Sequence, residues 1–505
     1  MRAKRLCALF LSLLLLGGSM TACASPEGAD ETEASSKEAA NVTEGEETEL
    51  RDSLPDDLDY GEDEVTFISR FREGWSSGEL TVPELNNETV NDAVYERNRA
   101  VEERLNIRIQ NIEIDTSDYD EVATKVKLAV QGNSRDYDLM ASPVNGAVPV
   151  MLDGVLFDLK QLDYLDLEKP WWSQGINDTA SYGDSQFVAT GSVVLSMYRF
   201  AFVTVFNQRL FTDANQPFLY EHVENGSWTL DKQISLVPLF HKDDGNGLQD
   251  PDRDVFGFLT GDVISTDSYW SSCEISILRP DEDDGLVMDF DSAKLQDVME
   301  KLLTLCYVTD QSTYVFHGHG SDDEQTDIRH AFATGNGAMA TLRILELENQ
   351  EMRSMTDKYG VVPMPKFSEE QKEYHTFLHN QFTVLAVLTT VEEARRNEMG
   401  AVLEALASES HRVVRPAYYE KTLRTTLAQD PESAAMMEII ANNVHMDKGV
   451  FYSRQLGDFY KYPRTVVQTK NNDIISYYAG LNVKWRRDLR QLLTRLDKIT
   501  SGNQA

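Results

Sequence analysis

The sequence is poor in cysteine and in basic residues. It has four cysteines among 505 residues, and no Cys-x-x-Cys or Cys/His spacing typical of a zinc site. Its 47 Lys and Arg are outnumbered by 84 Asp and Glu, so the formal net charge is −37. Such an acidic surface argues against binding to nucleic acids or to anionic lipid headgroups, because both are polyanions.

Two familiar enzyme motifs are absent: the sequence contains no HExxH and no P-loop. The histidine-rich stretch FHGHGSDDE (316–324) has no third histidine at a predictable distance, so a solvated loop is favoured over a metal site. The sequence has 84 acidic residues, so some of them must form pairs that resemble the catalytic carboxylates of a glycosidase. Such pairs are therefore no evidence for that class of enzyme. We therefore expect a protein that is not an enzyme.

Only the N-terminus carries a long apolar run. Arg2, Lys4 and Arg5 precede the apolar stretch 9–16, which predicts a signal peptide over residues 1–22. Met-Thr-Ala-Cys then resembles a bacterial lipobox, which implies a lipid on Cys23 and anchoring to the outer face of a cell membrane. An ordinary secretory signal is the alternative. No later stretch is apolar enough to span a membrane.

An acidic segment follows the signal. Between Glu27 and Asp59 the sequence has thirteen acidic residues, Lys37 and Arg51 as basic residues, and almost no large apolar residue. Such a composition predicts a disordered tether over residues 23–59 and a folded domain over 60–505. In that domain Cys273 and Cys306 are either a disulfide or two buried thiols.

The first part of the folded domain alternates between strand and helix patterns. Short β-rich runs at 65–68, 107–114 and 137–143 are separated by amphipathic helices at 91–106 and 118–131, the first capped by Asn91 or Asp92. This order predicts a parallel, helix-covered α/β sheet with ligands at the carboxyl ends of its strands. The C-terminal third is predicted to be helical at 392–408, 431–443 and 474–499.

KDDGNGLQDPDRDVFGF (242–258) looks like a calcium loop. With Gly247 at the sharp turn, the oxygen ligands in the middle of the loop would come from Asp244, Asn246, the Leu248 carbonyl and Asp250. Lys242 and Arg253 stand where the first and last ligands belong. We expect no required cofactor, and either a weak structural calcium or a simple tight turn.

Several segments, in order, resemble the bacterial extracellular solute-binding proteins (family 1, sugar-type) of ABC importers. They span about residues 65–496 and are FVTVFNQRLF (202–211), SWTLDK (227–232), DVFGF (254–258), AFATGNGAMA (331–340), YGVVPMP (359–365) and RPAY (415–418). The resemblance implies a two-lobed type II periplasmic-binding fold with discontinuous lobes and a hinge. One lobe would hold about 60–198 and 377–415, the other about 199–376 and 416–505.

The resemblance also implies a function. A monomeric lipoprotein would capture a solute, most simply a sugar or oligosaccharide, in the cleft between the lobes and deliver it to ABC permease subunits. A carbohydrate-active hydrolase and a ligand sensor for a signalling receptor are the alternatives.

Sugars need flat aromatic surfaces and fixed polar groups. Arg199 and Gln381 are neighbouring candidates for polar contacts, whereas Trp228 and Trp485 are expected in the core. Core packing is the alternative for each aromatic, and capping for each asparagine. The predicted ligand contacts are Trp75, Asn145, Trp171, Trp172, Tyr198, Tyr269, Trp270 and Asn380.

Overall fold

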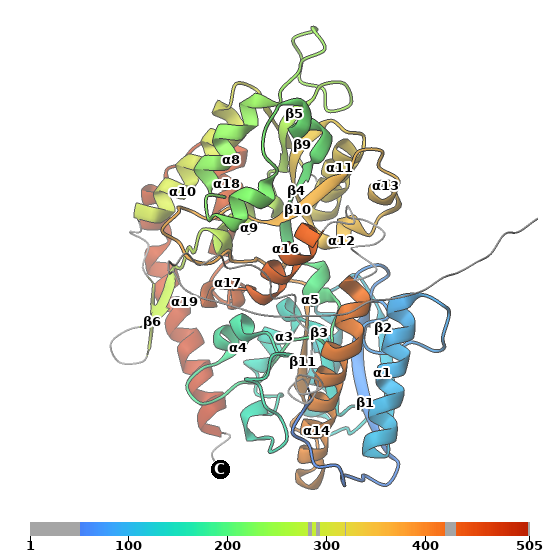
Figure 1. Ribbon diagram of the computed structural model, residues 1–505. Coiled ribbons are helices and arrows are strands. Elements are labelled where there is room, and N and C mark those ends of the chain that lie inside the picture. Colours follow the sequence, from blue (N-terminus) through green and yellow to red (C-terminus); the bar gives the residue numbers. More distant parts are fainter. Residues whose placement is uncertain (1–50, 281–284, 289–292, 319, 420–430, 503–505) are drawn as a thin grey trace, which may run out of the picture. The chain divides into compact units, whose positions relative to one another are not determined.

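The computed structural model describes residues 51–280, 285–288, 293–318, 320–419 and 431–502 (Figure 1). From Leu50 onward the chain forms one compact unit. The predicted signal peptide, Cys23 and the tether up to residue 50 lie outside the described residues.

Four strands form the first sheet, in the order β11-β3-β1-β2. β1 runs parallel to β2 and β3, as the strand–helix alternation predicts, whereas β11 is antiparallel to β3. Adjacent residues of a strand point to opposite faces of the sheet, and Phe67 and Ile68 of β1 are both buried. Both faces of β1 are therefore covered, and helices provide the cover. The strands are β1 (Asp63–Phe71), β2 (Ile107–Asp115), β3 (Leu139–Pro143) and β11 (Thr383–Val387). The helices around them are α1 (Thr89–Leu105), α2 (Glu121–Gln131), α3 (Val144–Met151), η1 (Leu159–Gln161), α4 (Gln174–Ala180), α14 (Glu393–Glu409) and η4 (Ser410–Val414).

The N-terminus of α1 differs from the prediction. Glu88, rather than Asn91 or Asp92, is the cap, and its carboxylate accepts a hydrogen bond from the Asn91 backbone N–H at 3.0 Å. The helix therefore begins two residues earlier than its apolar spacing predicts, at Thr89.

The second sheet has the order β10-β4-β9-β5-β8. β5 runs parallel to β8 and β9, and β4 runs antiparallel to β9 and β10. Its strands are β4 (Phe202–Asn207), β5 (Phe256–Gly261), β8 (Thr313–Phe316), β9 (Gly337–Arg343) and β10 (Tyr359–Pro363), and a separate hairpin pairs β6 (Leu278–Pro280) with β7 (Leu286–Met288). The helices of this half are α6 (Gln208–Asp213), α7 (Leu219–Glu224), α8 (Leu230–Leu236), η2 (Val237–Leu239), α9 (Ile264–Ser272), α10 (Ala293–Leu303), η3 (Thr304–Val308), α11 (Ser321–Ala333), α12 (Ile344–Leu347), α13 (Gln350–Arg353), α16 (Pro431–Asn442), η5 (Phe459–Lys461) and α18 (Tyr462–Thr469).

Two crossing segments join the sheets. Short helix α5 (Ser196–Arg199) leads into residues 200–202, which pair antiparallel with residues 377–379. Two backbone hydrogen bonds hold the crossing: Phe202 N–H donates to Phe377 at 3.0 Å, and His379 N–H donates to Phe200 at 2.9 Å. All strands of the first sheet fall in residues 60–198 and 377–415, and all strands of the second fall in 199–376.

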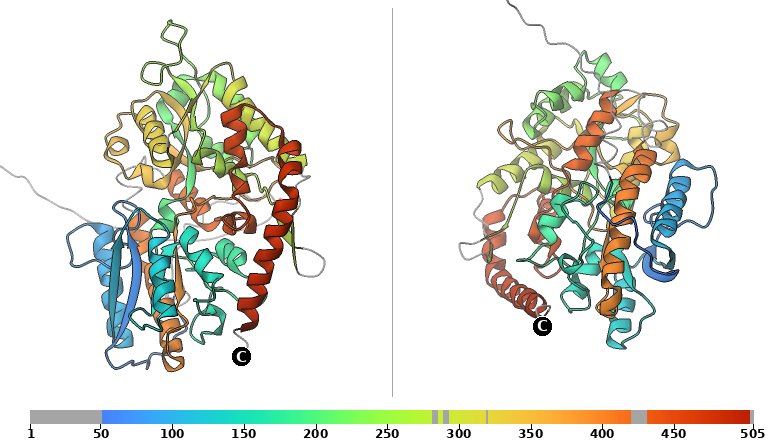
Figure 2. Two further views of the ribbon diagram at one scale, coloured as in Figure 1. Left: turned by 180° about the vertical axis from the view of Figure 1, so that it is seen from behind. Right: turned by 60° about the horizontal axis from the view of Figure 1, so that its bottom comes forward.

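The C-terminal segment differs from the prediction that places all of it in the second lobe. Helix α17 (Lys448–Phe451) packs against α3 and α4 of the first half, and the Lys448 ammonium donates to three backbone carbonyls at 178, 179 and 181. Helix α19 (Ile474–Gly502) also reaches the first half, where Arg495 pairs with Asp153 at 2.9 Å. Figures 1 and 2 show α19 running alongside both halves. This segment therefore bridges the two lobes.

The folded part starts before residue 60, so the predicted tether is too long at its C-terminal end. Leu54 is buried, and Asp52 forms an ion pair with Arg104 of α1 at 2.8 Å. Asp59 accepts a hydrogen bond from Asn106 at 2.7 Å. These contacts attach residues 52–59 to the first half, because their few anchoring side chains find partners at the end of α1.

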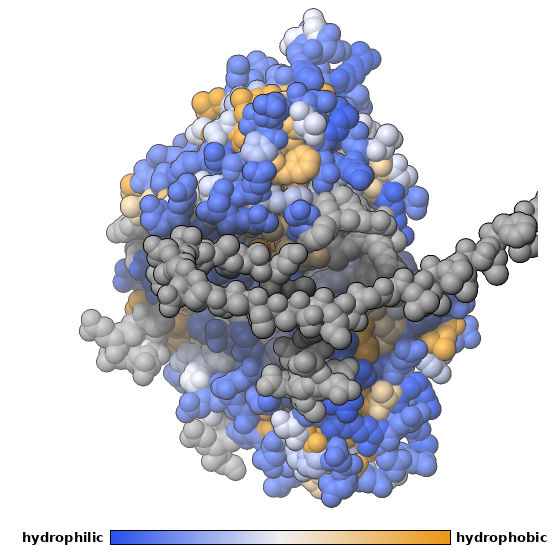
Figure 3. Space-filling model, in the orientation of Figure 1, coloured by the Kyte–Doolittle hydropathy of each residue, from blue (hydrophilic) through white to orange (hydrophobic). Residues whose placement is uncertain are grey.

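Both cysteines of the folded domain are free thiols. Cys273 and Cys306 are buried, and burial raises the pKa of each thiol to about 12. Of the two alternatives left by the sequence, buried thiols are therefore the one observed. Within the described ranges, none of the helices combines the length and apolar character that a membrane crossing requires. The surface in Figure 3 is largely hydrophilic where it is coloured.

Candidate functional site

The loop after β1 carries the first wall of the site. The Arg72 carbonyl accepts hydrogen bonds from the backbone N–H groups of Trp75, Ser76 and Ser77, which makes a tight turn at the carboxyl end of the strand. The Ser76 hydroxyl also donates to the Arg70 carbonyl at 2.9 Å. The turn holds the Trp75 indole half-buried beside a cavity of about 380 Å³.

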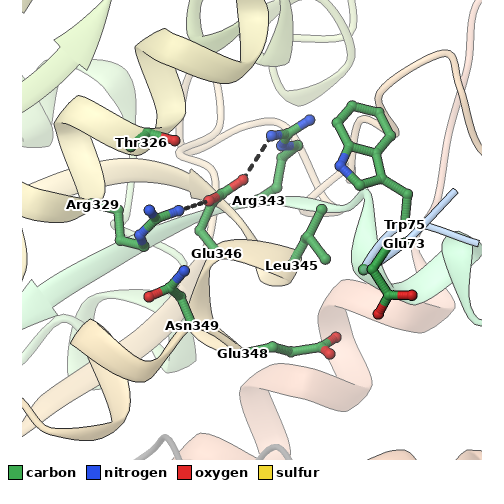
Figure 4. A pocket seen from close by; sticks show the side chains of 10 residues that line it. Glu73, Trp75, Thr326, Arg329, Arg343, Leu345, Glu346, Glu348 and Asn349 are labelled. Atoms are coloured by element: carbon green, nitrogen blue, oxygen red, sulfur yellow. Dashed lines mark hydrogen bonds and ion pairs between the residues drawn. The ribbon is translucent and has the colours of Figure 1, made fainter. Parts of the chain in front are cut away.

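The second wall of this cavity comes from the other sheet. Figure 4 shows side chains from α11, the end of β9 and α12 facing the loop that bears Trp75. The cavity is lined by Glu73, Gly74, Trp75, Thr326, Arg329, Arg343, Leu345, Glu346, Glu348 and Asn349. Because the two walls belong to different halves of the molecule, this cavity lies in an interlobe cleft.

Ion pairs fix the side chains of the second wall. The Glu346 carboxylate accepts from Arg329 at 2.5 Å and from Arg343 at 2.6 Å (Figure 4). Arg329 also donates to Glu351 at 3.1 Å. The two arginines are balanced by two carboxylates, Glu346 and the exposed Glu351, so the wall presents oriented polar groups without an isolated buried charge.

A second ion pair connects the cleft to the crossing segments. Arg199 donates to Glu348 at 3.0 Å, and Tyr418 donates to the same carboxylate oxygen at 2.8 Å. The Arg199 guanidinium also donates to the backbone carbonyl of Trp75 at 3.4 Å. One buried arginine of the first crossing thus contacts both walls.

Aromatic and cationic groups surround the Trp75 indole. The rings of Phe200 and His379, one from each crossing segment, meet it edge-on at centroid distances of 5.0 and 5.9 Å. The Arg72 guanidinium lies 3.5 Å from its ring centroid, and that of Arg343 lies 5.0 Å from it. Both distances allow cation–π attraction.

His379 is buried among arginines. Its Nδ1 atom lies 3.3 Å from an Arg343 nitrogen. Burial, and next the positive charges of Arg343, Arg464, Arg70 and Arg72, lower the pKa of His379 well below its ordinary value. The imidazole is therefore neutral at physiological pH and can accept a hydrogen bond from Arg343.

Of the eight residues predicted as ligand contacts, Trp75 is the one that lines the cavity. Trp171 and Trp172 are buried, and both indole N–H groups donate to the carboxylate of Glu404, at 3.2 and 3.1 Å. Glu404 lies on α14, so the two tryptophans pack in the first half. This corrects the prediction that one of them faces the cleft, because neither ring is accessible to a ligand here.

Tyr269 and Trp270 are also in the core. Both lie on α9, where every residue is buried, and the Tyr269 hydroxyl donates to Gln233 at 3.0 Å. The Trp270 ring packs on Phe459 at a centroid distance of 5.8 Å. Trp228 and Trp485 are buried, as expected. The alternative of core packing therefore describes Tyr269 and Trp270.

The remaining predicted residues lie near the crossing or the C-terminal segment. Tyr198 is buried, with its hydroxyl donating to Ser192 at 3.0 Å. Asn380 is half-buried and donates to the Tyr460 hydroxyl at 2.6 Å. Asn145 lies at the start of α3, where its carbonyl accepts from Arg454 at 2.7 Å. None of the three lines the cavity, so ligand contact by them stays a prediction.

Arg329, Arg343 and Glu346 were missed from the sequence. Arg343 ends β9, three residues after the segment AFATGNGAMA (331–340) that carries the family resemblance. The rule that ligands gather at strand carboxyl ends, applied to this second sheet, would have singled it out.

The predicted calcium loop forms tight turns around Asp254. This buried carboxylate accepts the backbone N–H groups of Asp244 and Asp250, each at 2.9 Å, and these bonds lower its pKa. Asn246 accepts the Leu248 N–H at 2.6 Å. Within the described residues, the carboxylates close enough to share an ion are those of Asp243, Asp244 and Asp254. Calcium binding here stays a prediction, with a partly different set of ligands.

The fold is shared with solved solute-binding proteins. The chain is similar to a cyclic alpha-maltosyl-1,6-maltose binding protein from Arthrobacter globiformis, at 12% identity and a TM-score of 0.58 over 85% of this chain and 100% of that one. It is also similar to UgpB from Mycobacterium tuberculosis in complex with glycerophosphocholine, at 13% identity and a TM-score of 0.55 over 86% and 100%. A third similar structure is the ABC substrate-binding protein Lmo0181 of Listeria monocytogenes in complex with cycloalternan, at 15% identity and a TM-score of 0.51 over 87% and 99%.

These similarities confirm the predicted fold class, an α/β fold with the two lobes of periplasmic solute-binding proteins. No family model matches the chain, and no curated protein matches it in sequence.

Proposed function

We propose that the protein is an extracytoplasmic receptor that binds a sugar or oligosaccharide between its lobes and delivers it to an ABC permease. One observation carries the proposal: the interlobe cavity has an indole on one wall and fixed arginine, glutamate and asparagine side chains on the other. This is the combination of apolar face and oriented polar groups that a sugar needs. The ligands named for two of the similar structures, cycloalternan and cyclic alpha-maltosyl-1,6-maltose, support the same class.

Hinge closure would couple binding to delivery. A ligand that contacts both walls stabilises the closed arrangement by its differential affinity, and a permease can then recognise that arrangement. In this proposal the chain is a monomer, is lipidated on Cys23 and stands on the outer face of the membrane. No chemical step on the solute is needed.

Calorimetry with neutral and acidic mono- and oligosaccharides tests the proposal, after a thermal-shift screen that finds ligands by their stabilisation of the folded state. We expect at least one saccharide to bind, and Trp75→Ala to weaken its binding about tenfold or more. Arg99→Gln, an exposed change on α1, is the matched control and leaves binding unchanged. Turnover of the saccharide would favour a hydrolase instead. Binding of peptides but of no saccharide would contradict the sugar class.

A further inference from the structure

The carboxyl edge of the first sheet is divided between the cavity and the protein's own chain. Strands β1, β2 and β3 run parallel, and β11 begins where β3 ends, with Thr383 opposite Pro143. Trp75 follows β1, whereas Asn145 follows β3 and Asn380 precedes β11. All three residues therefore lie at the edge where ligands of such sheets gather.

Residues 452–461 occupy the part of this edge formed by β3 and β11. They run from α17, which packs on α3 and α4 of the first half, to η5, which packs on α9 and α18 of the second half. On the way, the Arg454 guanidinium donates to the Asn145 carbonyl at 2.7 Å. The Tyr460 hydroxyl accepts a hydrogen bond from the Asn380 amide at 2.6 Å. Polar groups at this part of the edge are thus engaged by the chain itself.

The same segment also contacts the second half of the cleft. Phe459 packs on Trp270, with 5.8 Å between the ring centroids, and Trp270 lies on α9, which follows the carboxyl end of β5. The side chains of Phe459, Tyr460 and Trp270 are all buried. They therefore leave no surface for a solute between the ends of β3 and β5.

The cavity beside Trp75 lies at the ends of other strands, β1 in the first sheet and β9 in the second. None of the residues that line it belongs to the segment 452–461. Its volume of about 380 Å³ is near the lower end of the range of about 300–1,000 Å³ that is usual for ligand pockets. A space of this size suits one or two sugar rings better than a longer chain.

Asn349 offers a hydrogen-bond donor to this cavity. Its side-chain oxygen accepts the Glu351 backbone N–H at 3.0 Å, as the N-cap of α13. Its amide nitrogen has no acceptor in the part of the chain that the structure describes, and the residue lines the cavity opposite Trp75 (Figure 4). The amide can therefore donate to a sugar hydroxyl while its oxygen keeps the helix capped.

We propose that the captured solute is a mono- or disaccharide held wholly in the cavity beside Trp75, where the Asn349 amide donates to one of its hydroxyl groups. Residues 452–461 exclude longer chains, because they fill the neighbouring part of the cleft. The inference rests on the proposed function and narrows its ligand class to short saccharides. It assigns no ligand contact to the predicted residues that this segment covers.

Calorimetry on the purified protein with saccharides of graded length tests the inference. The probes are malto-, galacto-, manno- and xylo-oligosaccharides, each as a series of one to five sugar residues. In a series that binds, we expect the mono- or disaccharide to bind most tightly. Members of three or more residues should bind at least about tenfold more weakly, because their further rings have no place in the cavity.

Variants of Asn349 assign the contact. Asn349→Asp keeps the capping oxygen but replaces the donor by an acceptor, so it should weaken binding of the short sugar about tenfold or more. Asn225→Asp is the matched control, because the Asn225 side chain likewise accepts the backbone N–H two residues on, that of Ser227 at 3.0 Å. It lies away from the cavity and should leave binding unchanged.

Binding of tri- to pentasaccharides as tight as that of the short sugars would overturn the length limit and leave the proposed sugar receptor standing. Wild-type affinity in Asn349→Asp would overturn the assignment of the donor. A loss of affinity in Asn145→Ala as large as that in Asn349→Asp would place the solute over β3 and overturn its position beside Trp75. If no saccharide of any series binds, the proposed function and this inference fall together.

Discussion

Glu404 should make the stability of the protein fall as pH rises, an effect that Glu404→Gln removes. The Glu404 carboxylate lies in the core of the first half. It accepts hydrogen bonds from the indole N–H groups of Trp171 and Trp172 and from the backbone N–H of Asp166. Burial raises its pKa from 4.5 to about 7, although these hydrogen bonds act in the opposite direction. At about 1.4 kcal/mol per pKa unit, the ionised carboxylate destabilises the folded state by about 3 kcal/mol.

The sign of this effect follows from the two pKa values. Below pH 4.5 the carboxyl group is protonated in both the folded and the unfolded chain, so it has no effect on stability. Between pH 4.5 and about 7 the unfolded chain ionises first, and the free energy of unfolding decreases. Above pH 7 the full loss has developed.

Urea denaturation between pH 4.5 and 8 measures this loss as the difference between wild type and Glu404→Gln. Contributions from other groups cancel in the difference, including that of His445, whose pKa burial lowers to about 4. Glu409→Gln, at the end of the same helix, is the control for the substitution itself. A difference in unfolding free energy that is constant within about 1 kcal/mol over this range would refute the burial argument.

Three further predictions concern stability and reactivity. The buried thiols of Cys273 and Cys306 should resist alkylation in the native protein and react after denaturation, as peptide mass spectrometry would show; rapid native labelling would contradict their burial. Gly257→Ala should lower Tm by several degrees or prevent folding, because the new Cβ would lie 1.9 Å from a backbone oxygen, whereas Gly480→Ala, with open space around it, should not. Calcium titration should show weak uptake that Asp244→Asn reduces, and no heat at millimolar calcium would refute the predicted ion.

Local patterns predicted the elements well. The strands at 107–115 and 139–143 and the helix at 121–131 lie within a few residues of their predicted positions, because alternation and helical spacing are properties of short windows. The sequence also predicts the strand at 382–388, but local patterns could not predict its antiparallel pairing with β3. Its partner β3 lies 240 residues earlier in the chain, so only the tertiary fold brings the two together.

The candidate site likewise combines residues that local sequence patterns could identify with residues that only the tertiary fold brings together. Trp75 could be singled out because it follows a predicted strand end, where little core is available to it. The sequence could not decide between a cleft position and core packing for Trp171 and Trp172, because the carboxylate that accepts their N–H groups is more than 230 residues away. The second wall was missed for a related reason. In the fold, Arg329 and Arg343 line the cavity with both guanidinium groups held by Glu346, a contact that local sequence patterns do not reveal.

The contacts of Trp75 join the site to the hinge. Its carbonyl accepts from Arg199, and its ring meets Phe200 and His379, so both crossing segments contact the one indole. Any change in the angle between the lobes bends these crossings and must therefore change the packing around Trp75. In the proposed function, a ligand that rests on this ring would be sensitive to the same angle. In the proposed receptor, Trp75 would thus couple ligand occupancy to lobe closure, together with Arg199, which contacts both walls, while α17 and α19 contact the first half and bridge the two lobes.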